Sequence, residues 1–111
     1  MTAPPSPPAP RAQLPTGFAA PGPDTQAVFR CALQALSRPG RCFTLPGAAC
    51  RSLAPPARIS VALAALLLTL LDGETRIWLA PSLDQPLLRS WLAFHTGTAL
   101  APHAAAARFV A

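Results

Sequence analysis

Two arginines flank a proline-glycine turn in the segment Arg38-Pro39-Gly40-Arg41, which is the best candidate for an anion-binding site in this sequence. Guanidinium groups and the free amides of a turn bind the oxygens of phosphate and carboxylate groups. A simpler structural role also fits, because proline and glycine end a helix and arginine is favourable near the negative end of the helix dipole. We favour the structural role for this loop.

The other side chains that could do chemistry lack partners nearby in the sequence. His95 could transfer a proton, but it lies at an expected helix C-terminus with no carboxylate close to it, which favours a packed or helix-capping role. Asp72 and Glu74 could meet a metal, but two ligands without a third favour an ordinary turn. Trp78 and Trp91 fit the core or a subunit contact better than a stacking platform. We therefore assign no catalytic, cofactor-binding or metal-binding residue.

Some chemistry is excluded by the residue types present. The chain has no lysine, so it cannot itself form a Schiff base with a carbonyl substrate or with pyridoxal phosphate. Cys31, Cys42 and Cys50 are 11 and 8 residues apart, a spacing that suggests neither a zinc site nor a disulfide framework. We expect three reduced, mostly buried thiols. The expected reduced thiols, together with the absence of a secretory-type leader at Met1, predict a cytoplasmic location.

The composition indicates a chain that is poor in charge. Its residues are 51% hydrophobic and only 12% charged, against about 25% charged in typical soluble domains. This predicts either a surface covered by partners or a fold that lacks some of its elements. The net charge of +5 comes from arginines scattered singly along the chain, which argues against a nucleic-acid-binding face. Residues 1–23 hold eight of the 15 prolines and predict a disordered tail, followed by a partial α/β domain over residues 24–111.

The longest apolar run, Ile59–Leu71, is interrupted only by Ser60 and Thr69. A helix that is apolar on nearly every side must be buried. Thirteen residues span roughly 20 Å as a helix, whereas a membrane core is about 30 Å thick. We therefore predict a core helix rather than a membrane span, and we expect part of it to remain as an exposed apolar patch in this chain alone.

Helical spacing predicts a first helix that begins at Asp24 or Thr25 and ends before Pro39. Its core face is expected to carry the larger apolar side chains Phe29, Leu33 and Leu36, with Val28 and Ala32 beside them. The other elements follow from caps and breakers. They are a strand at 41–45, a start of the central helix at Pro55–Pro56, a turn at 72–74, a strand at 75–80, a helix capped by Asp84 that stops near Thr96–Gly97, a short helix within 99–107, and a strand from Arg108.

This alternation of helices and strands predicts an α/β domain. Because the chain ends inside an expected strand at Ala111, we expect the native fold to continue beyond it.

Five short segments of the sequence carry a resemblance to a known family: 24–30, 35–40, 67–72, 75–79 and 94–97. They occur in the order and approximate spacing seen in the H subunit of the bacterial carbon-phosphorus lyase core complex, the phosphonate metabolism protein PhnH family. The chain resembles that family from Gly17 to Ala111 and looks like its N-terminal half only.

The resemblance implies a role in organic phosphonate catabolism. The family's H subunit assembles with the G, I and J subunits, and the G, H and I proteins with the L protein are associated with making ribose 1-methylphosphonate 5-triphosphate from a nucleoside triphosphate and methylphosphonate. The implied fold is a three-layer α/β architecture similar to pyridoxal-phosphate-dependent transferases, without that cofactor. No family catalytic residue can be carried onto this sequence, so the expectation is a non-catalytic subunit of a transferase.

The partners expected are therefore the G, I and J subunits, with a homodimer also open, and neither nucleic acid nor membrane. Two alternatives remain. The chain could be a non-functional truncated remnant, which predicts no cooperative thermal transition, or a basic nucleic-acid-binding module, which predicts affinity that falls steeply with salt.

Overall fold

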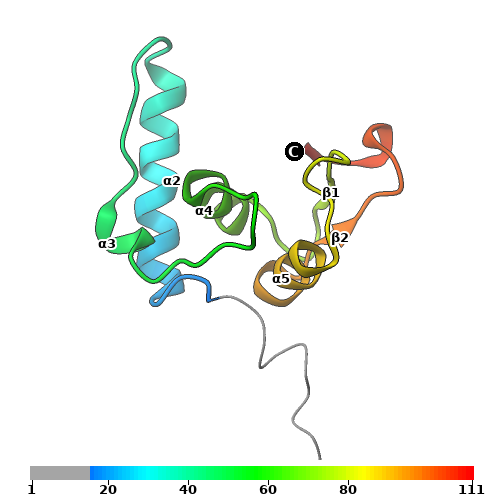
Figure 1. The fold of residues 1–111 in the computed structure, drawn as a ribbon. Coiled ribbons are helices and arrows are strands. Elements are labelled where there is room, and N and C mark those ends of the chain that lie inside the picture. Colours follow the sequence, from blue (N-terminus) through cyan, green and yellow to red (C-terminus); the bar gives the residue numbers. More distant parts are fainter. Residues whose placement is uncertain (1–15) are drawn as a thin grey trace, which may run out of the picture.

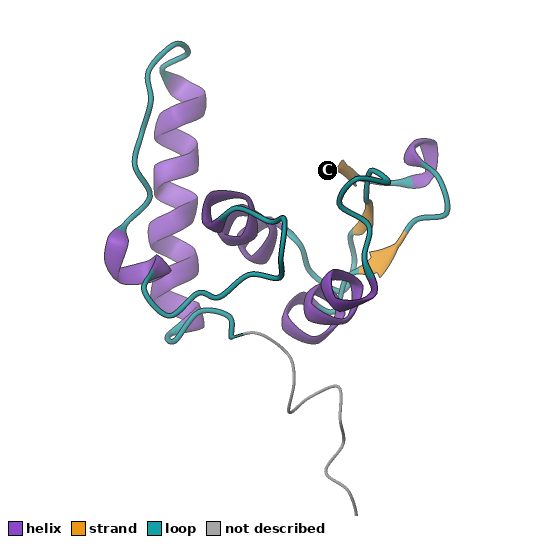
Figure 2. Cartoon of the chain, viewed as in Figure 1, coloured by secondary structure: helices purple, strands orange, loops and turns teal. Residues whose placement is uncertain are grey.

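The computed structural model describes residues 16–111, so residues 1–15 of the expected tail at 1–23 lie outside the described residues (Figures 1 and 2). The prediction of disorder is wrong for residues 21–23, which begin a helix. Within this range, the chain forms helices and one small parallel sheet, which is a mixed helix and strand fold. The elements in chain order are α2 (Pro21–Ser37), α3 (Gly47–Cys50), α4 (Val61–Leu70), β1 (Arg76–Trp78), α5 (Pro86–Thr96), β2 (Ala99–Leu100), the 3-10 helix η1 (Ala104–Ala106) and β3 (Phe109–Val110).

Helix α2 begins at Pro21, three residues before the predicted start. Proline is favourable in the first turn because its ring presets the helical φ angle and its missing N–H would have no partner there. Asp24 therefore does not cap the helix as predicted. It lies in the first turn, where its Oδ2 atom accepts a hydrogen bond of 3.0 Å from the backbone N–H of Ala20. The predicted stop before Pro39 is confirmed.

The predicted core face of α2 is largely wrong. Val28 is fully buried, but Phe29, Leu33 and Leu36 are 45%, 49% and 77% exposed. Helix α2 packs instead through its smaller residues against α4, where Ala64 and Ala65 are completely buried. Small side chains let two helices approach closely, and this contact determines which side of α2 faces inward.

The prediction of a core helix at 59–71 is confirmed as α4 over Val61–Leu70. Ser60 caps it, because its Oγ atom accepts a hydrogen bond of 3.1 Å from the backbone N–H of Leu63. The predicted start at Pro55–Pro56 is wrong, since a turn at Ala57–Arg58 separates these prolines from the helix. Among the described residues, no helix is long and apolar enough to cross a membrane.

The predicted strand at 41–45 is also wrong. This segment is extended but runs beside α2, where the Cys31 thiol donates a hydrogen bond of 3.6 Å to the backbone carbonyl of Thr44. A β-compatible sequence becomes a strand only when a neighbouring strand supplies ladder partners, and none lies beside this segment in the described residues.

Strand β1 is the centre of a parallel sheet with the order β2-β1-β3 in the described chain. Ile77 pairs with Leu100 of β2 on one side and with Phe109 of β3 on the other. The strands predicted at 75–80 and from Arg108 are confirmed, with narrower bounds. The prediction of a helix within 99–107 is wrong for Ala99–Leu100, which is a strand paired with β1. Only Ala104–Ala106 is helical, as one turn of 3-10 helix.

Helix α5 connects β1 to β2 and completes a β-α-β unit. Its first residue is Pro86 and its N-cap is Gln85, so the predicted capping role of Asp84 is wrong. The side-chain amide of Gln85 donates a hydrogen bond of 2.6 Å to the carbonyl of Ala57 and ties the start of α5 to the loop before α4. The largest fully buried side chains bring α2, β1 and α5 into one core; they are Trp91, Ile77, Leu88, Leu92 and Val28.

The predicted end of α5 at Gly97 is confirmed. Gly97 has φ of 74°, a left-handed conformation, and its N–H bonds to the carbonyl of Ala93. We expect Gly97→Ala to lower the free energy of unfolding by about 1–2 kcal/mol, because a Cβ atom is unfavourable in that conformation. Urea titration would measure this. Gly22→Ala is the matched control, since an added Cβ there meets nothing within 4 Å and no loss is expected; equal losses in both variants would contradict the prediction.

Candidate functional site

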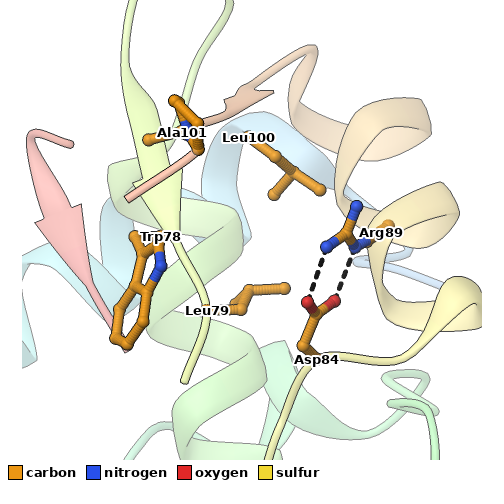
Figure 3. Close-up of a pocket in the computed structure, with 7 residues that line it drawn as sticks. Trp78, Leu79, Asp84, Arg89, Leu100 and Ala101 are labelled. Carbon is orange, nitrogen blue, oxygen red and sulfur yellow. Dashed lines mark hydrogen bonds and ion pairs between the residues drawn. The ribbon is translucent and has the colours of Figure 1, made fainter. Parts of the chain in front are cut away.

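A cavity of about 250 Å³ opens at the carboxyl ends of β1 and β2 (Figure 3). This edge of a parallel sheet is where α/β proteins commonly bind ligands, because the loops that follow adjacent strands diverge there. Its walls come from the end of β1, the segment before α5, the first turn of α5 and the end of β2. The lining residues are Trp78, Leu79, Asp84, Arg89, Leu100, Ala101 and Pro102.

An ion pair forms one wall of this cavity. The Nε and Nη2 groups of Arg89 donate hydrogen bonds of 2.5 Å each to the two carboxylate oxygens of Asp84. The two hydrogen bonds lower the pKa of Asp84 and raise that of Arg89, and the attraction between the charges acts in the same directions. Because the pair is bidentate, it fixes the orientation of the guanidinium plane beside the cavity.

The remaining walls are apolar or aromatic. Trp78 is half-buried and Leu79 is buried, and Leu100 approaches from the neighbouring strand. A site of this kind suits a small ligand with a planar or apolar part. Residues 16–111 contain no group of three or more His, Cys, Asp and Glu side chains that could hold a metal ion. The cavity thus combines a charge-compensated ion pair with apolar walls.

Removing the arginine should change the titration of its partner. In Arg89→Gln we expect the pKa of Asp84 to rise toward its ordinary value, because the charged hydrogen bonds that favour the carboxylate are lost. The lowered pKa means that the pair stabilises the fold above the ordinary pKa of an aspartate and that this contribution disappears as the pH falls through the lowered value. Carboxyl-detected NMR titration would measure the change, and an unaltered Asp84 curve would contradict the prediction.

The Arg38–Arg41 loop lies beyond the end of α2, away from this cavity (Figure 1). The backbone N–H of Arg38 donates to the carbonyl of Ala35, the N–H of Arg41 donates to the carbonyl of Arg38, and Gly40 has φ of 88°. This geometry is that of a helix stop followed by a tight turn. The structural role favoured from the sequence matches the position of the loop.

His95 is packed among rings and backbone. Its ring meets those of Trp91 and Phe94 edge-on, with centroid distances of 5.4 and 5.0 Å. Gly17 lies so close that an added Cβ would be 2.9 Å from the imidazole. The histidine also borders a separate cavity of about 120 Å³ beside Phe18 and the start of α2, so the structure does not bring it to the Asp84–Arg89 pair.

The other sequence candidates occupy ordinary structural positions. Asp72 accepts a hydrogen bond of 2.8 Å from the N–H of Glu74 in the turn after α4. Trp91 is fully buried, as expected for a core residue, whereas Trp78 lines the cavity. Cys42 is exposed and Cys31 and Cys50 are only partly buried, so the expectation of mostly buried thiols is wrong.

The two other thiols lie half-buried between α2 and α3. Cys31 and Cys50 are both free. Burial raises the pKa of Cys50, and the nearby Asp24 carboxylate and Cys31 raise it further. Both effects favour the neutral thiol over the nucleophilic thiolate.

Sequence reasoning missed the Asp84–Arg89 pair. The sequence indicates a helix cap at Asp84, but a carboxylate and an arginine on either side of a helix start can also meet across the first turn. The rule that ligands bind at the carboxyl ends of parallel strands would have indicated Trp78, Leu79 and the residues after Leu100 once the strand order was known.

Comparison with known proteins identifies the family. Residues 16–111 match the model of the family described as "Bacterial phosphonate metabolism protein (PhnH)". The chain belongs to this family. This confirms the resemblance that begins at Gly17 in the sequence, and the PhnH family match covers every described residue.

A curated PhnH relative supports the assignment. The chain is 42% identical over 80 residues to a protein of Rhizobium meliloti (strain 1021) named "Alpha-D-ribose 1-methylphosphonate 5-triphosphate synthase subunit PhnH". The aligned region covers 72% of this chain and 38% of the relative. The chain therefore spans well under half of the length of that PhnH protein.

Proposed function

We propose that this PhnH-family chain acts in organic phosphonate catabolism as a non-catalytic subunit of the carbon-phosphorus lyase core complex. In this role it supports the formation of ribose 1-methylphosphonate 5-triphosphate from a nucleoside triphosphate and methylphosphonate. The observation that carries the proposal is the family match over residues 16–111, together with a relative that is named as a subunit of this synthase. The G, I and J subunits are the proposed partners, in the cytoplasm.

The geometry favours a supporting role over a catalytic one. The cavity at the sheet edge holds an arginine whose charge is compensated by Asp84, and no nucleophile paired with a base lines it. His95 packs against Trp91, Phe94 and Gly17 and does not line this cavity. A subunit with these features would position other subunits or a ligand while groups elsewhere in the complex carry out the reaction.

The proposed architecture is a part of a three-layer α/β fold similar to pyridoxal-phosphate-dependent transferases. The parallel β2-β1-β3 order, with α5 as the crossover between β1 and β2, is compatible with such a fold. A homodimer is the accompanying proposal for the chain when other subunits are absent.

Co-purification tests the proposed function. The full chain, tagged and co-expressed with the G, I and J proteins, is expected to elute with them in one complex. In an assay that also contains the L protein, phosphorus NMR should show conversion of methylphosphonate and nucleoside triphosphate only when the chain is present. The matched control omits this chain alone. A chain that stays apart from the other subunits, or a reaction that proceeds equally without it, would refute the proposal.

A further inference from the structure

A depression of about 510 Å³ lies at the amino end of β1, at the opposite edge of the sheet from the cavity beside Asp84 and Arg89. Its volume falls in the range of small-molecule sites, about 300–1,000 Å³. The start of β1 and the turn before it form one side of this amino-end depression. The segment from η1 to the start of β3 forms the other side, and η1 contacts β1. The lining residues are Glu74, Arg76, Ala105, Ala106, Ala107 and Arg108.

Two arginines are neighbours across the strands that border the amino-end depression. Ile77 of β1 pairs with Phe109 of β3, so Arg76 and Arg108, the residues before them, lie side by side. The backbone N–H of Arg108 donates a hydrogen bond of 2.9 Å to the carbonyl of Arg76, which fixes this arrangement. Because side chains alternate along a strand, Arg76 lies on the sheet face opposite to buried Ile77. Both arginines are exposed to solvent.

The charges of these two arginines are not compensated within residues 16–111. The described chain pairs Arg89 with Asp84, whereas Glu74, which also lines the amino-end depression, makes no salt bridge to Arg76 or Arg108. Two guanidinium groups and one carboxylate leave the depression with net positive charge. Like charges on directly opposed residues of neighbouring strands destabilise a sheet. An anion bound between the two guanidinium groups would remove this repulsion.

We propose that the amino-end depression binds a phosphate group, with Arg76 and Arg108 donating hydrogen bonds to its oxygens. A guanidinium group presents a planar fork that binds two oxygens of one anion at once. One fork therefore occupies both oxygens of a carboxylate, whereas a tetrahedral phosphate group has further oxygens for a second fork. The proposed function assigns no ligand to this edge of the sheet, and the site does not depend on assembly with other subunits.

The phosphate group could belong to a free anion or to the phosphate chain of a nucleotide. The same two guanidinium groups would bind either, because both present tetrahedral, negatively charged phosphorus centres with several oxygens. Inorganic phosphate and pyrophosphate represent these two sources in the experiment. Similar affinities for the two probes identify a site for a single anion, and clearly tighter binding of pyrophosphate identifies a site for a phosphate chain.

Phosphorus NMR titration of each probe with the full chain, at constant pH and ionic strength, measures the binding. At least one of the two probes is expected to bind. Arg76→Gln and Arg108→Gln should each raise the Kd at least about tenfold, because each removes charge-assisted hydrogen bonds to the anion. Circular dichroism verifies that the variants fold. Failure of both probes to bind would overturn the inference.

Two further variants separate a specific site from attraction by net charge. Arg30→Gln on α2 is the matched control, since Arg30 is an exposed arginine that does not line the amino-end depression, and its Kd should change less than about twofold. Glu74→Gln should lower the Kd about two- to fivefold, because it removes a carboxylate that repels the anion. A loss in Arg30→Gln equal to that in Arg76→Gln would overturn the inference, as would a Kd that Glu74→Gln leaves unchanged or raises.

Discussion

Trp91→Ala is expected to lower the free energy of unfolding by about 3–5 kcal/mol, because removal of a buried aromatic side chain loses its transfer energy and leaves a cavity. Trp91 is 0% exposed and is the largest of the fully buried side chains. Since small domains are stable by only about 5–15 kcal/mol, much of the population should be unfolded under mild conditions. Urea titration followed by circular dichroism would measure the loss.

Trp78→Ala provides the comparison for the tryptophan substitution. Trp78 is half-buried at the wall of the sheet-edge cavity, where solvent can fill the space left by the ring. Trp78→Ala should therefore lower the free energy of unfolding clearly less than Trp91→Ala does. Equal losses for the two tryptophans would show that burial in the core does not determine the effect.

Ala65→Asp is expected to destabilise the fold by about 4 kcal/mol at pH 7, because burial that raises the carboxyl pKa by about 3–5 units keeps the folded state protonated over about three pH units in which the unfolded state ionises, at about 1.4 kcal/mol per unit. Ala65 is completely buried and belongs to the core cluster that includes Val28 of α2. A carboxylate at this position would lose its hydration without gaining a cation, since the cluster consists of apolar residues.

The pH dependence of this variant gives a specific readout. A raised folded-state pKa means that the variant loses stability as the pH rises above the unfolded-state value of about 4, until the folded-state value is passed. Ala62→Asp on the exposed side of α4 is the control and should show neither effect. Thermal unfolding across a pH series would measure both variants. A flat profile for Ala65→Asp, parallel to that of Ala62→Asp, would contradict the prediction.

The elements that could be predicted from the sequence are those whose signals are local. Helix α4 is apolar at nearly every position, so its burial did not depend on which side faced the core. The end of α5 at Gly97 and the strand around Ile77 followed from a left-handed cap residue and from β-branched and aromatic residues bounded by turns. The strand at Ala99–Leu100 could not be predicted, because it exists only through pairing with β1.

The orientation of α2 shows why periodicity alone was insufficient. The helix has two apolar faces, one with small residues around Val28 and one with the larger Phe29, Leu33 and Leu36. Size favours the second face for burial, but close packing with Ala64 and Ala65 of α4 favours the first. The choice depends on the shape of a partner helix that lies later in the chain, which a single helical pattern does not contain.

The candidate site was hidden for a related reason. Its residues come from the end of β1, the start of α5 and the end of β2, and they become neighbours only through the strand order. Local motifs instead drew attention to Arg38–Arg41 and to His95, which the structure places at a helix stop and in a packed ring cluster. Family membership, in contrast, could be recognised from short segments in register.

The order of the strands also has a consequence for synthesis on the ribosome. Strand β1 is central in the sheet, yet both of its neighbours come after it in the chain, with Ile77 paired to Leu100 and to Phe109. At about 5–20 residues per second, translation from Trp78 to Val110 takes about 2–6 seconds. Both edges of β1 lack their native hydrogen-bond partners until Leu100 has been made, and the edge that pairs with β3 lacks them until Val110 has been made. The central strand of this sheet is therefore made first, but it is paired on both sides only after β3 has been made.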